Sequence, residues 1–136
     1  MKTVDQSAVD AALASTRPRR ISIVDDDSSI REALKGLMRS VRFDVEAFAS
    51  AEEFLASDRL NDTDCLILDV VLPGMSGFDL QNHLNIEKRG IPIIFITAHS
   101  DDSSRQRALK RGAIDLLGKP VRREALFKAL QSAIQQ

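Results

Sequence analysis

The sequence is short of the features that mark zinc, membrane and nucleic-acid-binding proteins. It has one cysteine and two histidines in 136 residues, and they lack the spacing of zinc ligands. Cys65 lies in an apolar run, which favours a buried, inert thiol over a redox role. No apolar run approaches the length of a membrane span. The formal net charge of -1 provides no basic surface, so we expect neither membrane insertion nor DNA binding by this chain alone.

Three further absences concern chemistry and location. The sequence has no glycine-rich nucleotide-binding loop and no oxyanion-hole motif. Nor does its N-terminus have a signal-peptide pattern, so the cytoplasm is the expected compartment. What the chain does have is 43% hydrophobic and 29% charged residues, a composition typical of a globular protein.

The large apolar residues are distributed unevenly along the chain. Residues 1–19 are mostly small and polar, and we expect them to form a flexible N-terminal arm. Residues 20–136 suffice for one α/β domain with a real core, and no second domain fits.

The stretch around which the rest is organised runs from residue 65 to residue 77. Four apolar residues lead into Asp69, and a turn containing Pro73 and Gly74 follows. A continuous apolar run suits a strand that is buried on both faces of a parallel sheet covered by helices. In such sheets the chemistry lies beyond the carboxyl ends of the strands. Asp69 is therefore expected to lie at a functional position.

Strand patterns and helix patterns alternate through the domain. Strands are predicted at residues 20–24, 43–48, 65–69, 93–96 and 113–118. Helices are predicted at residues 28–40, 50–55, 76–86, 101–111 and from about 121 to the chain end. Ser50 and Glu53 suggest a capping box, whereas the last helix lacks a capping side chain. Because such units connect by right-handed crossovers, the predicted fold class is α/β, a doubly wound five-stranded parallel sheet with helices on both faces.

Four strand ends bring polar groups to one edge of this sheet. Asp25 and Asp26 follow the first strand, and Asp69, Thr97 and Lys119 end the third, fourth and fifth. Clustered carboxylates repel, which raises their pKa values unless a cation compensates. Oxygen ligands with room for water favour Mg²⁺. A carboxylate beside such a cation can act as a covalent nucleophile toward a phosphoryl group.

Four motifs, in order, resemble one known family. Residues 23–27 read Ile-Val-Asp-Asp-Asp, residues 68–77 contain Leu-Asp and then Pro-Gly-Met-Ser-Gly, residues 96–98 read Ile-Thr-Ala, and residues 119–120 read Lys-Pro. This set resembles the receiver domain of two-component response regulators, of the type found in FixJ-like transcriptional regulators. The resemblance covers roughly residue 20 to the C-terminus and implies a flavodoxin-like fold.

The resemblance implies a phospho-acceptor and a metal site. Asp69 resembles the acceptor, and Asp26 resembles the carboxylate metal ligand. Asp25 would hold the metal partly through water, and Val71 would contribute only its backbone carbonyl. The implied cofactor is Mg²⁺, for which Mn²⁺ could substitute.

The resemblance also implies a switch. Thr97 resembles the hydroxyl that moves to the phosphoryl oxygen, Ala98 resembles the small residue beside it, which we assign to the cofactor-binding side, and Lys119 resembles the lysine that pairs with the phosphoryl group. The bond between Lys119 and Pro120 would be cis. Leu116 departs from the family, which usually has Tyr or Phe there as a rotating switch.

The implied function is a signalling domain, with no reaction beyond its own phosphorylation and dephosphorylation. A sensor histidine kinase would be the phosphoryl donor. The response would pass to the face formed by residues 101–111, 113–118 and the last helix, for partner binding or a homodimer.

Two alternatives remain. A phosphatase of the haloacid-dehalogenase type also uses Mg²⁺ and an aspartyl nucleophile, but it normally has a second Asp two residues later, where this chain has Val71. A pseudo-receiver would act as an interaction module without taking phosphate, and the complete set of Asp25, Asp26, Asp69, Thr97 and Lys119 argues against it.

Overall fold

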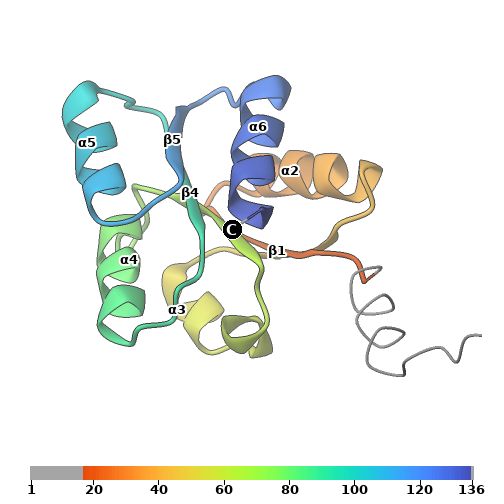
Figure 1. Cartoon of the computed structure of the whole chain (residues 1–136), viewed down its shortest axis with the longest axis horizontal. Helices are drawn as coiled ribbons and strands as arrows, with labels where there is room; N and C mark the ends of the chain where they lie inside the picture. The colour runs from red at the N-terminus through yellow and green to blue at the C-terminus, as the bar shows by residue number, and fades with distance from the viewer. Residues whose placement is uncertain (1–16, 136) are drawn as a thin grey trace, which may run out of the picture.

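The computed structural model describes residues 17–135 of the 136 in the chain. The predicted arm over residues 1–19 therefore lies largely outside the described residues, and its boundary at residue 20 stays a prediction. Figure 1 shows the described part as one layered body with helices on either side of a sheet.

The described chain alternates strands and helices, as the sequence predicts. Its five strands are β1 (Arg20–Val24), β2 (Asp44–Phe48), β3 (Cys65–Asp69), β4 (Ile93–Thr97) and β5 (Asp115–Gly118). Its helices are α2 (Ser28–Ser40), α3 (Ala51–Leu55), the 3-10 helix η1 (Asp58–Asn61), α4 (Gly77–Ile86), α5 (Asp102–Lys110) and α6 (Arg123–Ile134). The 3-10 helix was not predicted.

Within residues 17–135 the strands form one parallel sheet of five in the order β2-β1-β3-β4-β5. The chain leaves β1 toward β2 on one side and later returns to add β3 on the other. This change of direction is the topological switch point, outside which ligands bind in sheets of this order. Val24 is in register with Leu68 and Asp69 with Ile96, so the carboxyl ends of the central strands lie level.

Helices cover both faces of the sheet, which confirms the doubly wound fold. In Figure 1, α3, α4 and α5 lie on one side and α2 and α6 on the other. The strand side chains alternate accordingly: Leu66 and Leu68 of β3 pack with the first group of helices. Cys65 and Ile67 pack with α2 and α6. A strand buried on both faces needs the continuous apolar run seen in the sequence.

Two strands begin later than predicted for a common reason. Phe43 N donates to Met38 O across Arg42, which has φ of 67°. Ala113 N likewise donates to Ala108 O across Gly112, which has φ of 99°. Phe43 and Ala113 therefore close the preceding helices, in the pattern of a left-handed C-terminal cap. Their backbone N–H groups are not free to pair within the sheet.

Side chains cap α2 and α4, and the capping box predicted for α3 needs a correction. Asp27 caps α2, and Ser76 caps α4 in a reciprocal box with Asp79. Ser50 Oγ accepts from Glu53 N, but the Glu53 carboxylate accepts from Ala49 N, one residue before the predicted partner. The start of α6 has no side-chain cap among the described residues, as predicted.

Candidate functional site

Three carboxylates meet beyond the carboxyl ends of β1 and β3. Asp25, Asp26 and Asp69 each offer an oxygen within 4.8 Å of the others. Asp25 is 0% exposed and Asp69 4% exposed, whereas Asp26 faces solvent. Two of the three acids are thus removed from water, and an unpaired charge is costly in such a buried position. The third acid can exchange ligands with solvent.

Lys119 supplies a cation to both buried acids. Its Nζ lies 2.9 Å from Asp25 Oδ2 and 3.0 Å from Asp69 Oδ2. Its backbone N donates to Thr97 O at 2.7 Å, and the peptide bond to Pro120 is cis, as the resemblance implies. The end of β5 therefore brings an ammonium group between the acids of β1 and β3.

Burial and the neighbouring charges both shift the pKa values of Asp69 and Lys119. Burial raises the pKa of Asp69 above its ordinary value, and the Asp25 charge adds to the rise, while Lys119 and the Val71 N–H partly offset it. Burial opposes the charged form of Lys119, but the hydrogen bonds and charges of the two acids outweigh it and raise the pKa of Lys119. The lysine therefore stays protonated beside its acceptors.

The donor set of this cluster fits a hard divalent cation. Asp25 Oδ1 accepts from Asp27 N at 2.9 Å. Asp25 Oδ2 is buried, and within the described residues the Lys119 ammonium group, 2.9 Å away, is the charge paired with it. A buried carboxylate oxygen with spare acceptor capacity, beside the exposed Asp26, is suited to Mg²⁺, which binds few carboxylates and keeps several waters.

The loop from residue 70 to residue 76, which we call the β3–α4 loop, follows the central acid. Its Val71 N donates to Asp69 Oδ1 at 3.2 Å, while the Val71 side chain is 64% exposed. Its end folds back, because Gly77 N donates to Val70 O at 2.9 Å. A Cβ at Gly77 would collide with the Asp69 carbonyl oxygen. Only glycine allows α4 to start this close to the acid.

The predicted switch residues lie on the neighbouring strand ends. Thr97 is buried, and its Oγ1 accepts from His99 N at 3.1 Å. Ala98 and His99 are exposed just beyond it. Leu116, in β5, is 3% exposed and paired in register with Phe95. The Thr97 hydroxyl is thus held by its own loop.

Two residues near the acids were not predicted. Arg31 Nη1 donates to Asp25 O at 2.8 Å, so the second turn of α2 holds the end of β1. Glu52 Oε2 accepts from Met75 N at 3.1 Å, so α3 holds the β3–α4 loop. An arginine shortly after an acidic strand end is a usable signal for the first. The second depends on how the loop curves, which no local pattern indicates.

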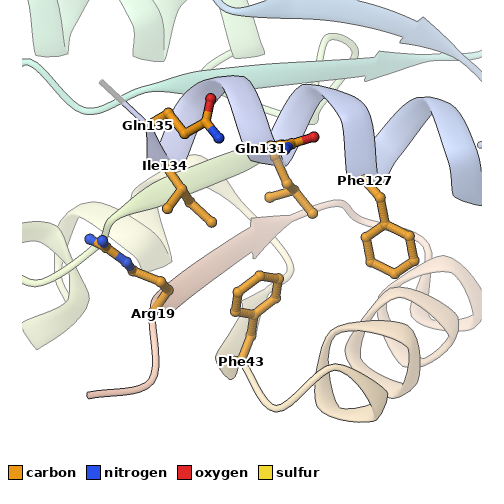
Figure 2. Close-up of a pocket in the computed structure, with 7 residues that line it drawn as sticks. Arg19, Phe43, Phe127, Gln131, Ile134 and Gln135 are labelled. Carbon is orange, nitrogen blue, oxygen red and sulfur yellow. The ribbon is translucent and has the colours of Figure 1, made fainter. Parts of the chain in front are cut away.

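Two other features of the described chain, a groove and the cysteine, lie away from this edge. An apolar groove opens beside α6 and the starts of β1 and β2, which is the opposite end of the strands (Figure 2). Its lining comprises Arg19, Phe43, Phe127, Leu130, Gln131, Ile134 and Gln135. Cys65 is fully buried, as predicted, and burial raises the pKa of its thiol to about 12. The described part of the chain contains no helix long and apolar enough to cross a membrane.

Comparisons with known proteins agree with this geometry. A family model described as the response regulator receiver domain matches residues 21–131. Nodulation protein W of Bradyrhizobium diazoefficiens is 47% identical over 116 residues, which cover 85% of this chain and 51% of that protein. Transcriptional regulatory protein FixJ of the same species is 33% identical over 121 residues, 89% of this chain and 59% of FixJ.

Solved structures give the same result. The structure of response regulator StyR matches with a TM-score of 0.80 and 45% identity, covering 88% of this chain and 60% of that chain. The chain spans little more than half the length of the two curated relatives above. The motifs, the sheet order and these comparisons agree, and the chain belongs to the response regulator receiver domain family of two-component signalling proteins.

Proposed function

We propose that Asp69 accepts a phosphoryl group from a sensor histidine kinase in a Mg²⁺-dependent reaction. The observation that carries the proposal is the pairing of the buried Asp69 carboxylate with Lys119 Nζ at 3.0 Å, at the mouth of the central strand. The carboxylate is the nucleophile and the ammonium group is a ready partner for the incoming phosphoryl oxygens.

The transfer we propose is an in-line displacement. An Asp69 carboxylate oxygen attacks phosphorus, an O–P bond forms, and the P–N bond to the kinase histidine breaks with its electron pair left on the imidazole nitrogen. The product carries about -1.5 to -2 charges at neutral pH. Lys119, which bridges both acids in the unphosphorylated chain, would turn toward the new phosphoryl oxygens.

The metal would be held by Asp25, Asp26, Asp69 and the Val71 carbonyl, with Asp25 acting partly through water. Mg²⁺, or Mn²⁺ in its place, would neutralise charge on the phosphoryl oxygens when bound. The residues of this chain orient the acceptor and exclude water from the buried acids. They support a domain that promotes only its own phosphorylation and dephosphorylation.

For the output, we propose that Thr97 moves to the phosphoryl oxygen beside Ala98. To do so its hydroxyl must give up the hydrogen bond from His99 N. The face formed by α5, β5 and α6 would then change, favouring a partner or a homodimer. Leu116 has no ring to rotate, so Thr97 and the backbone after it would carry the change.

The surroundings of this domain are also a proposal. FixJ is named a transcriptional regulatory protein, and this chain covers only 59% of it, so a DNA-binding output would belong to residues outside this chain. We also propose that residues 20–136 form the receiver domain and that the cytoplasm is its compartment.

Phosphorylation in vitro tests the central proposal. With a small acyl-phosphate donor and Mg²⁺, intact-mass measurement should detect a singly phosphorylated form that later decays. Asp69→Ala should not be labelled. If Asp69→Ala takes as much phosphate as the wild type, the acceptor is another residue. Continuous turnover without a phospho-form would indicate a phosphatase, and no labelling at all a pseudo-receiver.

A further inference from the structure

The β3–α4 loop carries the groups that the proposed metal site needs next to Asp69. Val71 donates its N–H to Asp69 Oδ1, and its carbonyl is the proposed metal ligand. The start of the loop is tied to the sheet, because Val70 N donates to Ile96 O at 3.0 Å, and its end is tied to its start, because Gly77 N donates to Val70 O at 2.9 Å. The turn between these ties needs a support of its own to fix where Val71 lies.

Glu52 provides a tie in that turn. Its Oε2 accepts from Met75 N at 3.1 Å, over a separation of 23 residues. Gly74 beside it has φ of 72°, and a Cβ there would lie 2.5 Å from the same Oε2. The carboxylate therefore lies directly against the turn backbone, and glycine is what allows this approach. A hydrogen bond to an ionised acceptor is stronger than a neutral one.

The helix that presents Glu52 is itself anchored to the other acid. Phe54 of α3 is fully buried and packs edge-on against Phe48, with ring centroids 5.7 Å apart. Phe48 O in turn accepts from Asp25 N at 3.1 Å. The segment from Phe48 to Phe54 thus touches the loop of Asp25 at one end and, through Glu52, the loop of Asp69 at the other.

We propose that Glu52 is a positioning residue for the metal and acceptor site, an inference that rests on the proposed function. By holding Met75, it restricts the β3–α4 loop to the conformation in which the Val71 carbonyl and N–H face the carboxylates. A ligand held in place before binding costs less to order when the metal arrives. Glu52 touches neither metal nor phosphate in this role.

Metal binding to the unphosphorylated chain tests the proposal. Glu52→Ala should weaken Mg²⁺ binding, measured by titration, by roughly 2- to 10-fold, the effect of losing one net hydrogen bond. The Met75 amide should also exchange faster with solvent in the absence of metal. The site carboxylates remain in this variant, so a change in affinity reports on the loop.

Glu53→Ala is the matched control. Glu53 is the next residue of the same helix, and its carboxylate accepts from Ala49 N, away from the loop. Its loss should lower stability through the helix cap and leave Mg²⁺ affinity unchanged. Glu52→Gln keeps an oxygen that can accept from Met75 N, but without the charge that strengthens the bond, so its Mg²⁺ affinity should lie between those of Glu52→Ala and the wild type.

The outcomes separate this inference from the proposed function. If the wild type binds no Mg²⁺, the metal-dependent function fails and the inference fails with it. If the wild type binds Mg²⁺ and Glu52→Ala binds it equally well, only the inference is overturned. It is also wrong if Glu53→Ala weakens binding as much, or if Glu52→Gln loses as much as Glu52→Ala, because the effect would then be general destabilisation or charge.

Discussion

The acceptor corner, formed by Asp25, Asp69 and Lys119 at three strand ends, can be compared with the α5 corner, formed by α5 and its contacts to α4 and β5. In the acceptor corner both acids are buried and the lysine bridges them. In α5, all of which the structure describes, Ala108 is the only buried residue. Little apolar area therefore holds this helix to the body.

Polar contacts take the place of apolar packing in the α5 corner. Arg105 pairs with Asp115 at 2.6 Å, and the Arg107 guanidinium lies 4.3 Å from the centre of the Phe78 ring. Gln81 Nε2 donates to Ala108 O at 3.1 Å, but its buried Oε1 has no partner within residues 17–135. The contacts of the exposed Arg105 and Arg107 can be exchanged for contacts with water at low cost.

The difference separates two requirements of a signalling domain. The phosphoryl transfer that we propose needs groups that are already in place, and buried strand ends provide them. A response needs an element whose local opening costs less than global unfolding, and few buried apolar contacts mark such an element. The α5 corner is accordingly the part of the chain best suited to move.

The largest expected effect comes from crowding the acceptor corner. In Gly77→Ala the new methyl group would collide with the Asp69 carbonyl oxygen and lie 3.0 Å from Val70 Cα, and both neighbours are backbone atoms. We expect the free energy of unfolding to fall by about 3 kcal/mol or more. Urea unfolding measures the loss.

Gly36→Ala is the control for that substitution. Gly36 lies in α2, where an added Cβ meets no atom within 4 Å. Replacing glycine in an open helix interior should instead stabilise the chain by about 0.5–1 kcal/mol. Equal stabilities for the two variants would mean that the backbone around Asp69 yields easily and that the acceptor corner is not rigid.

A second prediction concerns how the two corners communicate. Leu116→Ala should cost about 2–4 kcal/mol of stability through a cavity, since the side chain is buried, and yet keep any phosphorylation-dependent dimerisation. Thr97→Ala should lose that response with a smaller change in stability. Sedimentation of both variants, phosphorylated and unphosphorylated, measures this. Loss of the response in Leu116→Ala at unchanged stability, with Thr97→Ala responding normally, would make Leu116 the switch.

The strand ends of the acceptor corner could be predicted from the sequence because parallel strands place their carboxyl ends at one edge. Each apolar run ended in a polar residue, and the sheet needed only its usual connections to bring Asp25, Asp69 and Lys119 together. The bridging of both acids by one ammonium group was not predicted. The sequence predicted that the clustered acids need a cation, and Lys119 already compensates part of their negative charge.

Features that depend on backbone curvature were missed. The late starts of β2 and β5 follow from hydrogen bonds that close the preceding helices across Arg42 and Gly112. The spacing of apolar residues does not indicate such bonds. The tie from Glu52 to Met75 joins segments that share no pattern. These contacts arise once the elements have packed, so they are visible only in three dimensions.

Beside the acceptor corner, two adjacent acids should behave differently. Asp26 contributes an oxygen to the cluster, whereas Asp27 Oδ1 accepts from Ser29 N at 2.8 Å and caps α2. Asp26→Ala should weaken Mg²⁺ binding at least about tenfold, because even outer-shell partners are worth that much. Asp27→Ala should cost about 1 kcal/mol of stability as a lost helix cap and bind metal normally. Equal Mg²⁺ affinities in a titration would refute the choice of ligand.

The smallest change in global stability is expected in the α5 corner. The Arg105 side chain is 49% exposed and its partner Asp115 26% exposed, so Arg105→Ala should lower the free energy of unfolding by less than about 1 kcal/mol. Locally the effect should be larger, since this pair is one of the few links from α5 to β5. We expect hydrogen exchange of the α5 amides to accelerate while that of α2 stays unchanged.

Lys35→Ala, which breaks the Lys35–Glu32 pair of α2, is the matched control. That helix also buries Leu34 and Met38, so its amides should remain protected without the pair. If both variants leave exchange unchanged, polar contacts do not hold α5, and the contrast between the two corners has another origin.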